Sequence, residues 1–323
     1  MDEIILSVLV PTYNHENYIE KALDSIINQK TSYKYEVLVG EDLSPDNTRS
    51  ILKKYEEQHP NKIIVFYRDV NLYKTLNGPD NHMDLLRRAK GKYVIFLEGD
   101  DYWTDVNKIE TQIEFLENNK EYIAVAHNCI VVDKNNNEIA TLYPECKELD
   151  YNLGYYVRGI LPGQLATVMM RNIHKINGFD VAMWEKRLVP GDRIFYFTLL
   201  NSGKIYCIQK QMSAYRYITD SGTSFSANVK YDFHYSEYWH SELAGFAIGT
   251  GKKEFIKCAE TLFFACLVRG VVYNQIGIKE MLKRCSKITM KWKVLFTFAS
   301  IAIPVYLKKF LIRLYDDLKT KCM

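Results

Sequence analysis

The sequence predicts an α/β fold with a mostly parallel, doubly wound sheet and a helical C-terminal extension. In the first hundred residues, short apolar runs alternate with segments whose apolar residues recur at helical spacing. Strands that alternate with helices in this way are typical of a parallel sheet with helices on both faces. From Tyr231 onward the pattern is helical throughout, and no proline interrupts it before Pro304.

Each element of the first half follows from its apolar pattern. The expected strands span residues 4–10, 35–40, 63–67 and 93–97. The expected helices span residues 17–28, 48–55 and 81–89. Either Asp46 or Asn47 is available to cap the second of these helices, because both side chains can accept a hydrogen bond from an N-terminal N–H group.

After Asp101 the regular alternation of strand and helix ends. We expect helices at 108–118 and 192–201, and strands at 123–133, 139–143, 167–171 and 204–217. Residues 134–138 predict a hairpin turn between the first two of these strands, since they are rich in asparagine. Residues 145–165 are irregular.

The most informative stretch is residues 93–103, where a short apolar strand ends in Glu98, Asp100 and Asp101. Unpaired buried charge is costly, so a buried strand that runs into three carboxylates calls for a positive partner. A hard divalent cation such as Mg²⁺ or Mn²⁺ prefers such oxygen ligands, often together with substrate phosphates. The alternative is a solvated turn, for which adjacent acids are common.

Polar clusters also follow the first two strands, at residues 11–14 and 41–46. In doubly wound sheets, ligands bind beyond the carboxyl ends of the strands. All three polar clusters fall at such ends, which predicts a nucleotide site there.

Composition limits the class of protein. Apolar residues make up 47% of the 323 and charged residues 25%, which is ordinary for a globular chain. The seven cysteines are scattered without metal spacing and indicate reduced thiols in a cytoplasmic setting. The start, Met1-Asp2-Glu3, lacks the basic residues of a signal peptide. Basic residues are not interleaved with exposed aromatics, so nothing predicts a nucleic-acid partner.

Seven short motifs resemble, in their order, those of family 2 glycosyltransferases of the GT-A fold. They include Val-Leu-Val-Pro-Thr-Tyr-Asn at 8–14 and Leu-Glu-Gly-Asp-Asp-Tyr-Trp at 97–103, and the others lie at 40–48, 89–93, 127–129, 191–192 and 215–216. The family is the large inverting group that builds bacterial surface polysaccharides, capsule and cell envelope included.

The resemblance implies a GT-A (nucleotide-diphospho-sugar transferase) domain over residues 1–225. Its nucleotide-binding half would span 1–103 and its acceptor-binding half 104–225, followed by a helical region at 226–323. Pro11 and Tyr13 would line the base pocket, and Asp42 would accept a hydrogen bond from the uracil imide.

The resemblance also assigns the sugar-diphosphate contacts. Glu98 stands where the family has the first residue of Asp-x-Asp, and its longer arm would still reach a ribose hydroxyl or a metal-bound water. Asn81 belongs to the same nucleotide-binding set. Arg216, in a loop at 215–224, would close over the diphosphate, with a surface arginine as the alternative.

Asp100 is the expected metal ligand and Asp101 the second. Mn²⁺ or Mg²⁺ held there would neutralise the diphosphate leaving group as a Lewis acid. Many relatives supply a further ligand from a histidine after the Tyr-Arg pair, but here Tyr217-Ile218-Thr219 follows. The third ligand is therefore open, and His127 is a remote candidate.

Inverting transfer requires one general base to take the proton of the acceptor hydroxyl. Asp192 fits this role because it follows Pro190-Gly191, opens a predicted helix and matches the family's position. A helix N-terminus is expected to hold its pKa low. The alternative is a plain helix-capping aspartate.

The apolar run at 294–307 is shorter than the roughly 20 residues that span a bilayer, and lysines flank it on both sides. This pattern favours a helix lying in the membrane interface, and an ordinary buried helix is the alternative. A peripheral position at the inner face of the cell membrane would suit a lipid-linked acceptor.

The sequence thus predicts an inverting glycosyltransferase that moves a sugar from a UDP-linked donor to a lipid-linked or polysaccharide acceptor. One alternative is a nucleotidyltransferase, although such enzymes usually carry a Gly-rich basic loop after the first strand, where this chain has Pro-Thr-Tyr-Asn-His-Glu-Asn. The other is a sugar-nucleotide-binding protein without catalysis.

Overall fold

The structure is a computed structural model, and it describes residues 3–73, 80–140, 145–176, 182–186, 191–218 and 232–285. Contacts divide the chain into two compact units: Met1–Asn152 with Leu161–Val229, and Leu153–Ile160 with Lys230–Met323. The predicted membrane-associated run at 294–307 lies outside the described residues.

The first half of the first unit alternates strand and helix as predicted. Its elements are β1 (Leu6–Thr12), α1 (Ile19–Ile27), β2 (Tyr35–Glu41), α2 (Thr48–Gln58), β3 (Ile63–Tyr67), α3 (Asn81–Arg88) and β4 (Tyr93–Phe96). Most side chains of these strands are buried, and their sequences are accordingly largely apolar.

The second half of this unit contains shorter and more varied elements. They are β5 (Tyr102–Trp103), α4 (Lys108–Asn118), β6 (Tyr122–Val132), β7 (Glu138–Ile139), β8 (Asp150–Tyr151), the 3₁₀ helix η1 (Leu165–Thr167), β9 (Met169–Arg171), η2 (Ile173–Lys175), α6 (Ala182–Glu185), α7 (Gly191–Ser202) and β10 (Lys204–Arg216).

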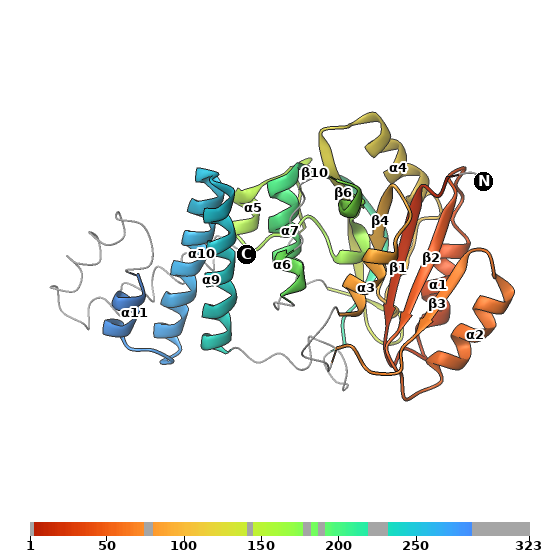
Figure 1. The fold of residues 1–323 in the computed structure, drawn as a ribbon, viewed down its shortest axis with the longest axis horizontal. Helices are drawn as coiled ribbons and strands as arrows, with labels where there is room; N and C mark the ends of the chain where they lie inside the picture. The colour runs from red at the N-terminus through yellow and green to blue at the C-terminus, as the bar shows by residue number, and fades with distance from the viewer. Residues whose placement is uncertain are drawn as a thin grey trace. The chain divides into compact units, whose positions relative to one another are not determined.

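The strands of this unit form one sheet in the order β3-β2-β1-β4-β9-β6-β10-β5, and β1 to β4 lie side by side in Figure 1. β3, β2, β1 and β4 are parallel to their neighbours, and β10 is parallel to β6. β9 runs antiparallel between β4 and β6. The predicted α/β fold with a mostly parallel sheet is confirmed.

Two predicted strands are shorter than expected. The strand expected at 167–171 begins only at Met169, because Thr167 closes a 3₁₀ turn in which its N–H and its hydroxyl both donate to the carbonyl of Gln164. The strand expected at 139–143 retains only its start in β7, and residues 141–144 lie outside the described part of the chain.

The main core packs helices against one face of the sheet. Ile19, Leu23 and Ile26 of α1 and Ile109, Ile113 and Leu116 of α4 pack with alternate residues of the strands, including Val8, Val10, Val37, Val39 and Ile95. Alternation places every second strand residue on the same face. This packing holds the strands rigidly, and with them the loops at their ends.

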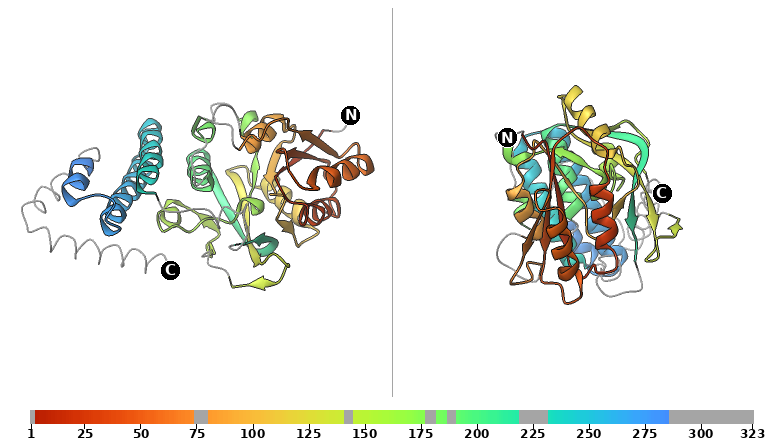
Figure 2. Two further views of the ribbon diagram at one scale, coloured as in Figure 1. Left: turned by 90° about the horizontal axis from the view of Figure 1, so that it is seen from below. Right: turned by 90° about the vertical axis from the view of Figure 1, so that its right-hand side faces the viewer.

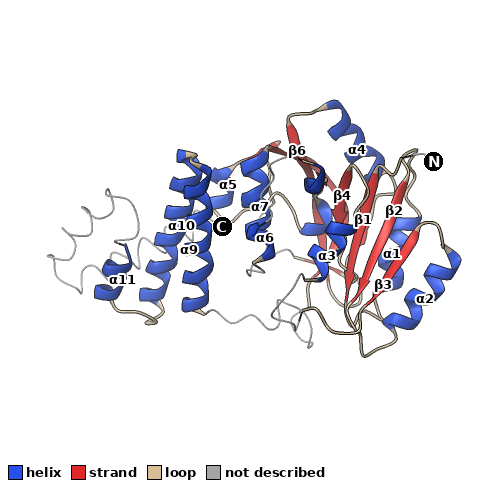
Figure 3. Ribbon diagram, viewed as in Figure 1, coloured by secondary structure: helices blue, strands red, loops and turns tan. Residues whose placement is uncertain are grey.

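The described part of the second unit is helical (Figure 3). It contains α5 (Leu153–Val157), α9 (Phe233–Thr250), α10 (Lys253–Val272) and α11 (Ile278–Cys285). α9 and α10 lie side by side in Figure 2, joined at Gly251, whose φ of 67° ends α9 in the left-handed conformation. Phe233, Leu267 and Met281 belong to their common core.

None of the described helices is both long enough and apolar enough to cross a bilayer.

We expect Leu52→Ala, on α2, to lower the free energy of unfolding by about 2–5 kcal/mol, because it leaves a cavity in the main core. Lys53→Ala, the exposed neighbour on the same helix, should change it by less than about 0.5 kcal/mol. Urea denaturation of both variants measures the difference. Equal effects of the two substitutions would contradict this assignment of the core.

Candidate functional site

Three loops meet at the carboxyl ends of β1, β2 and β4, as the sequence predicts. The N–H of Asp42 donates to the carbonyl of Thr12 over 3.0 Å, and that of Gly99 donates to the carbonyl of Pro11 over 3.1 Å. Because β1 is parallel to both β2 and β4, the three strands end at one edge of the sheet. The three polar clusters therefore form one surface, where sheets of this kind bind ligands.

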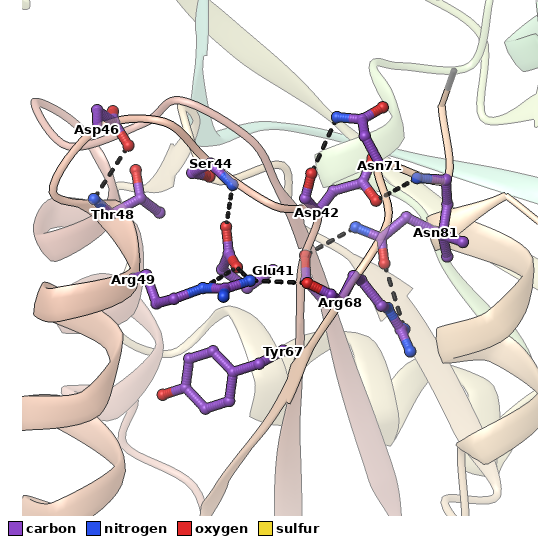
Figure 4. Close-up of polar contacts among 12 residues, drawn as sticks. Glu41, Asp42, Ser44, Asp46, Thr48, Arg49, Tyr67, Arg68, Asn71 and Asn81 are labelled. Atoms are coloured by element: carbon purple, nitrogen blue, oxygen red, sulfur yellow. Dashed lines mark hydrogen bonds and ion pairs between the residues drawn. The ribbon is translucent and has the colours of Figure 1, made fainter. Parts of the chain in front are cut away.

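The loop after β1 is held by the loop after β2. Three consecutive N–H groups of the first loop donate to side chains of the second: Asn14 to Ser44, His15 to Thr48, and Glu16 to Asp46. Asn47 is the N-cap residue of α2 but its side chain makes no capping hydrogen bond, whereas Asp46 accepts from the N–H of Thr48 over 3.0 Å (Figure 4). Burial alone would raise the pKa of Asp46, but the hydrogen bonds from Thr48 and Glu16 lower it.

The predicted base-pocket residues lie at this edge. Pro11 is buried within β1, and Tyr13 follows the strand half-buried. The buried Asp42 accepts hydrogen bonds from the N–H groups of Leu72 (2.6 Å) and Tyr73 (3.2 Å), and its own carbonyl accepts from Asn71. Asp42 thus fixes the segment after β3, and its bond to a uracil imide stays a prediction.

Asn81 begins α3 and is buried against the end of β2. Its Nδ2 donates to the carbonyl of Gly40 over 2.7 Å, and its Oδ1 accepts from Arg68 over 3.4 Å (Figure 4). A side chain at Gly40 would collide with Asn81, because a Cβ there would lie 2.1 Å from Asn81 Oδ1. These contacts give Asn81 a structural role, and its predicted contact with nucleotide is untested.

Glu41 is a structural acid that the sequence analysis did not single out. It is fully buried, accepts from the N–H of Ser44 over 2.6 Å, and pairs with Arg49, whose Nη2 lies 2.5 Å from Oε2 (Figure 4). A fully buried carboxylate needs such partners. The only sign of this pair in the sequence is an arginine at the second position of α2, which by itself is too common to identify a partner.

Asp101, in the loop after β4, is buried and only half satisfied. Its Oδ1 accepts from the N–H of Arg216 over 2.8 Å, whereas its Oδ2 is buried and has no hydrogen-bond partner among the described residues. Burial and the charges of Asp100 and Glu98 raise the pKa of Asp101 well above its ordinary value. Burial and Glu98 also raise the pKa of Asp100, against the opposing effects of His15 and Arg216.

Two histidines that the sequence analysis did not single out flank these acids. His15 Nε2 lies 3.9 Å from Asp100 Oδ2, and His82 Nε2, in α3, lies 3.6 Å from Glu98 Oε1. Burial lowers the pKa of His82, but Glu98, Asp80 and Asp42 together raise it above its ordinary value. Neither histidine stands in a recognisable motif, and only the fold brings them to the acids.

Arg216 is the last residue of β10 and is buried, so it lies within the strand expected at 204–217 and not in the loop expected at 215–224. Its Nε donates to the carbonyl of Asp100 over 2.8 Å. The Nη atoms donate to the carbonyl of Asp133 and to Asn136 Oδ1, and the guanidinium lies over the ring of Tyr18. These contacts tie the acid loop to neighbouring segments, and they leave the predicted contact with diphosphate untested.

Asp192 lies in the first turn of α7, half-buried, and its Oδ1 accepts from the N–H of Arg193 over 2.8 Å. The expected low pKa is wrong. Burial, with the charge of Glu98, raises the pKa of Asp192 above its ordinary value despite the opposing effect of Arg193. Here desolvation outweighs the helix terminus, because removing water disfavours the charged form.

His127 is buried within β6, and its Nδ1 lies 2.7 Å from the carbonyl oxygen of Asn128. Burial and the nearby Lys108 hold the pKa of His127 well below its ordinary value.

The acid loop fits a divalent cation. Asp101 Oδ2 is an orphaned buried acceptor, and the raised pKa values of Asp100 and Asp101 show that negative charge there is not fully compensated. Within the described ranges, no three His, Cys, Asp or Glu side chains are already arranged around one metal position. An ion held here would therefore need substrate or water oxygens as well, which is usual for Mg²⁺.

A sequence model of glycosyl transferase family 2 matches residues 7–174, just over half of the chain, and the chain belongs to this family. The matched range contains the three strand-end loops described above.

Curated relatives support the family. The chain is 33% identical to the uncharacterized protein Rv1520 of Mycobacterium tuberculosis over 127 residues, which are 39% of this chain and 36% of that protein. It thus spans about a third of the length of the first relatives that it matches. It is 29% identical to WfgD of Escherichia coli, a UDP-Glc:α-D-GlcNAc-diphosphoundecaprenol β-1,3-glucosyltransferase, over 209 residues, or 64% of this chain and 74% of WfgD.

Solved structures show the same fold. Staphylococcus aureus TarS (residues 1–349), in complex with UDP-GlcNAc, matches with a TM-score of 0.62 and 17% identity over 86% of this chain and 78% of that one. The mannosyltransferase PcManGT of Pyrobaculum calidifontis, with GDP-Man and Mn²⁺, matches with a TM-score of 0.53 and 17% identity over 100% of this chain and 86% of that one. The GT-A fold expected from the resemblance is confirmed.

We expect Arg216→Met to lower the free energy of unfolding by about 1–3 kcal/mol, because it removes the guanidinium donors to the carbonyls of Asp100 and Asp133 and to Asn136 Oδ1. Arg87→Met, at an exposed arginine of the same unit, should change stability by less than about 0.5 kcal/mol. Chemical denaturation measures both. A mild effect at Arg216 would show that the acid loop holds its shape without this arginine.

Asp101→Asn is expected to stabilise the metal-free protein at neutral pH. An acid whose pKa is higher in the folded than in the unfolded chain weakens the fold progressively as pH rises from the ordinary Asp pKa of about 4 through the raised value. The gain in melting temperature should therefore be largest near pH 8 and shrink toward pH 4. The exposed Asp69→Asn is the control, and a pH-independent gain would argue against this origin.

Proposed function

We propose that this chain is an inverting glycosyltransferase that transfers a sugar from a UDP-linked donor to a lipid-linked or polysaccharide acceptor. The observation that carries the proposal is a set of acids whose pKa values burial and the charge of Glu98 raise: Asp100 and Asp101 after β4, and Asp192 at the start of α7. Strongly perturbed acids gathered at a ligand-binding edge are candidates for catalysis.

The donor assignment rests on the family and on the neighbours. TarS was solved with UDP-GlcNAc, and WfgD is named for a UDP-Glc donor. In this chain the nucleotide would lie against Pro11, Tyr13 and Asp42, with the sugar and diphosphate toward Glu98 and Asp100. WfgD is also named for a diphosphoundecaprenol-linked acceptor, which supports a lipid-linked acceptor for this chain.

Asp192 is the proposed general base. It would accept the proton of the acceptor hydroxyl while that oxygen bonds to the anomeric carbon, and the bond from this carbon to the diphosphate breaks on the opposite face. A carboxylate with a raised pKa is a stronger base than an ordinary aspartate, so burial improves the match to this task. The charge of Glu98 contributes to the same shift.

Asp100, with Asp101, would hold Mn²⁺ or Mg²⁺. The ion supplies Lewis-acid stabilisation of the diphosphate leaving group when it is bound. Glu98 occupies the edge of this cluster, with its side chain 38% exposed beside His82, and remains available to a ribose hydroxyl. Arg216 maintains the shape of the acid loop through the backbone of Asp100.

The test is UDP release from a panel of UDP-, GDP- and dTDP-sugars, with Mn²⁺, Mg²⁺ or EDTA and with membrane lipid extract as the acceptor source. We expect one UDP-sugar to be used with a metal ion. Asp192→Asn should reduce turnover by about 10²–10⁴-fold with donor affinity unchanged, because only the proton acceptor is lost. Turnover of the unmodified protein should fall as pH drops through the raised pKa of Asp192.

Four other outcomes would overturn parts of this proposal. Release of pyrophosphate from a nucleoside triphosphate and a sugar phosphate would identify a nucleotidyltransferase. Donor binding in calorimetry without turnover on any acceptor extract would indicate a binding protein. Full activity in EDTA would contradict the proposed role of the metal ion, and full activity of Asp192→Asn would contradict the proposed role of Asp192 as the base.

A further inference from the structure

His15 directs its imidazole ring between β1 and the acid loop. Its Nδ1 lies 3.0 Å from Oγ1 of Thr12, and its Nε2 lies 3.9 Å from Oδ2 of Asp100. The His15 side chain is 17% exposed and that of Asp100 28%, so both are partly shielded yet open to a ligand.

The position of His15 is fixed from three sides. Its N–H donates to Thr48 Oγ1 over 2.9 Å, and Thr12 holds its ring. Gly99 lies beneath the ring, because a Cβ there would be 2.5 Å from Thr12 Oγ1 and 2.6 Å from His15 Nδ1. Only glycine allows the acid loop to approach so closely. The packing of three separate segments therefore sets the ring opposite Asp100.

The hydrogen bond to Thr12 engages one ring nitrogen of His15 and leaves the other one able to bind a ligand. A threonine hydroxyl can accept the Nδ1–H, and the neutral ring then carries its free lone pair on Nε2. Metal-binding histidines typically donate their other ring N–H to a protein oxygen in this way. In that tautomer the Nε2 lone pair faces the carboxylate of Asp100, and a cation between the two would be bound by both.

The distance between the two groups suits a shared ion. At 3.9 Å, His15 Nε2 and Asp100 Oδ2 are too far apart for a direct hydrogen bond. Two ligands that each lie about 2.1 Å from one ion are separated by about 3.0 to 4.2 Å, depending on the angle between them. The buried, unpartnered Oδ2 of the adjacent Asp101 is a second observation that positive charge is missing here.

We propose that His15 is a metal ligand of this chain, binding through Nε2 the divalent cation held by Asp100, with Thr12 as the residue that orients its ring. The inference rests on the metal site of the proposed function and deepens it. It assigns the nitrogen ligand to the loop after β1, whereas the segment Tyr217-Ile218-Thr219 after β10 offers none.

His82 provides a matched control within the same site. It lies as close to an acid as His15 does, with Nε2 3.6 Å from Glu98 Oε1, and its side chain is 38% exposed. It pairs with Glu98 rather than with Asp100. Each substitution removes one imidazole beside an acid of the same cluster, so a loss of Mn²⁺ affinity confined to the His15 variants indicates a ligand role.

The experiment measures Mn²⁺ bound to the full chain in the presence of UDP. Titration followed by electron paramagnetic resonance gives the affinity, and pulsed resonance on protein with ¹⁵N-labelled histidine detects a coordinated imidazole. We expect the ¹⁵N signal in the unmodified protein and in His82→Ala, and its loss in His15→Ala and His15→Gln. His15→Ala should weaken Mn²⁺ binding by about 10-fold or more, and Thr12→Val should weaken it less.

The outcomes separate this assignment from the metal site itself. Mn²⁺ that binds the unmodified protein, depends on Asp100 and shows no histidine nitrogen overturns the role of His15 and leaves the proposed function intact. A nitrogen signal that persists in His15→Ala does the same. If Mn²⁺ does not bind the unmodified protein with UDP, the metal step of the proposed function fails together with this assignment. The measurement on the unmodified protein does not depend on whether any variant folds.

Discussion

Buried negative charge at the carboxyl ends of the strands is the constraint on which the rest of this structure depends. Glu41, Asp42 and Asp101 all follow or end buried strands and are themselves buried. The protein satisfies Glu41 with Arg49 and Ser44, and Asp42 with two backbone N–H groups. Such bonds remove most of the penalty of burial. These bonds also hold the loops against one another. The acids that stabilise the edge of the sheet are therefore those that already have partners.

The remaining acids differ in how completely they are satisfied. Asp101 keeps one oxygen without a partner, Asp100 faces His15 across a gap, and Asp192 takes one short-range hydrogen bond from Arg193. Burial raises the pKa of each of the three. A satisfied acid is part of the framework, whereas an unsatisfied one stores unfavourable free energy that a cation or a proton can relieve. Hydrogen bonding therefore separates the acids that stabilise the loops from the acids that remain available to a cation or a proton.

Arg216 connects the acid loop after β4 to the end of β10. This residue ends β10, which is far from β4 in the sequence, and it binds the backbone of Asp100 and the carboxylate of Asp101. The family match ends at residue 174, so Asp192 and Arg216 lie in the part of the chain that the family model does not cover. The three strand-end loops thus lie within the range that the family model matches, while α7 and β10 lie beyond it.

The sequence by itself determined the α/β class, the strand-end acids and the family, because apolar period and motif order are local properties that one chain can show. It located Asp100, Asp101 and Asp192, but it gave Asp192 the wrong pKa and placed Arg216 in a loop. Only the tertiary structure decided these points. Desolvation depends on every neighbouring element, and the partners of Arg216 and His15 come from segments that chain order does not relate. His15 lies outside the family motifs, and the motif that contains Glu41 does not show its partner, so spatial proximity alone reveals their roles.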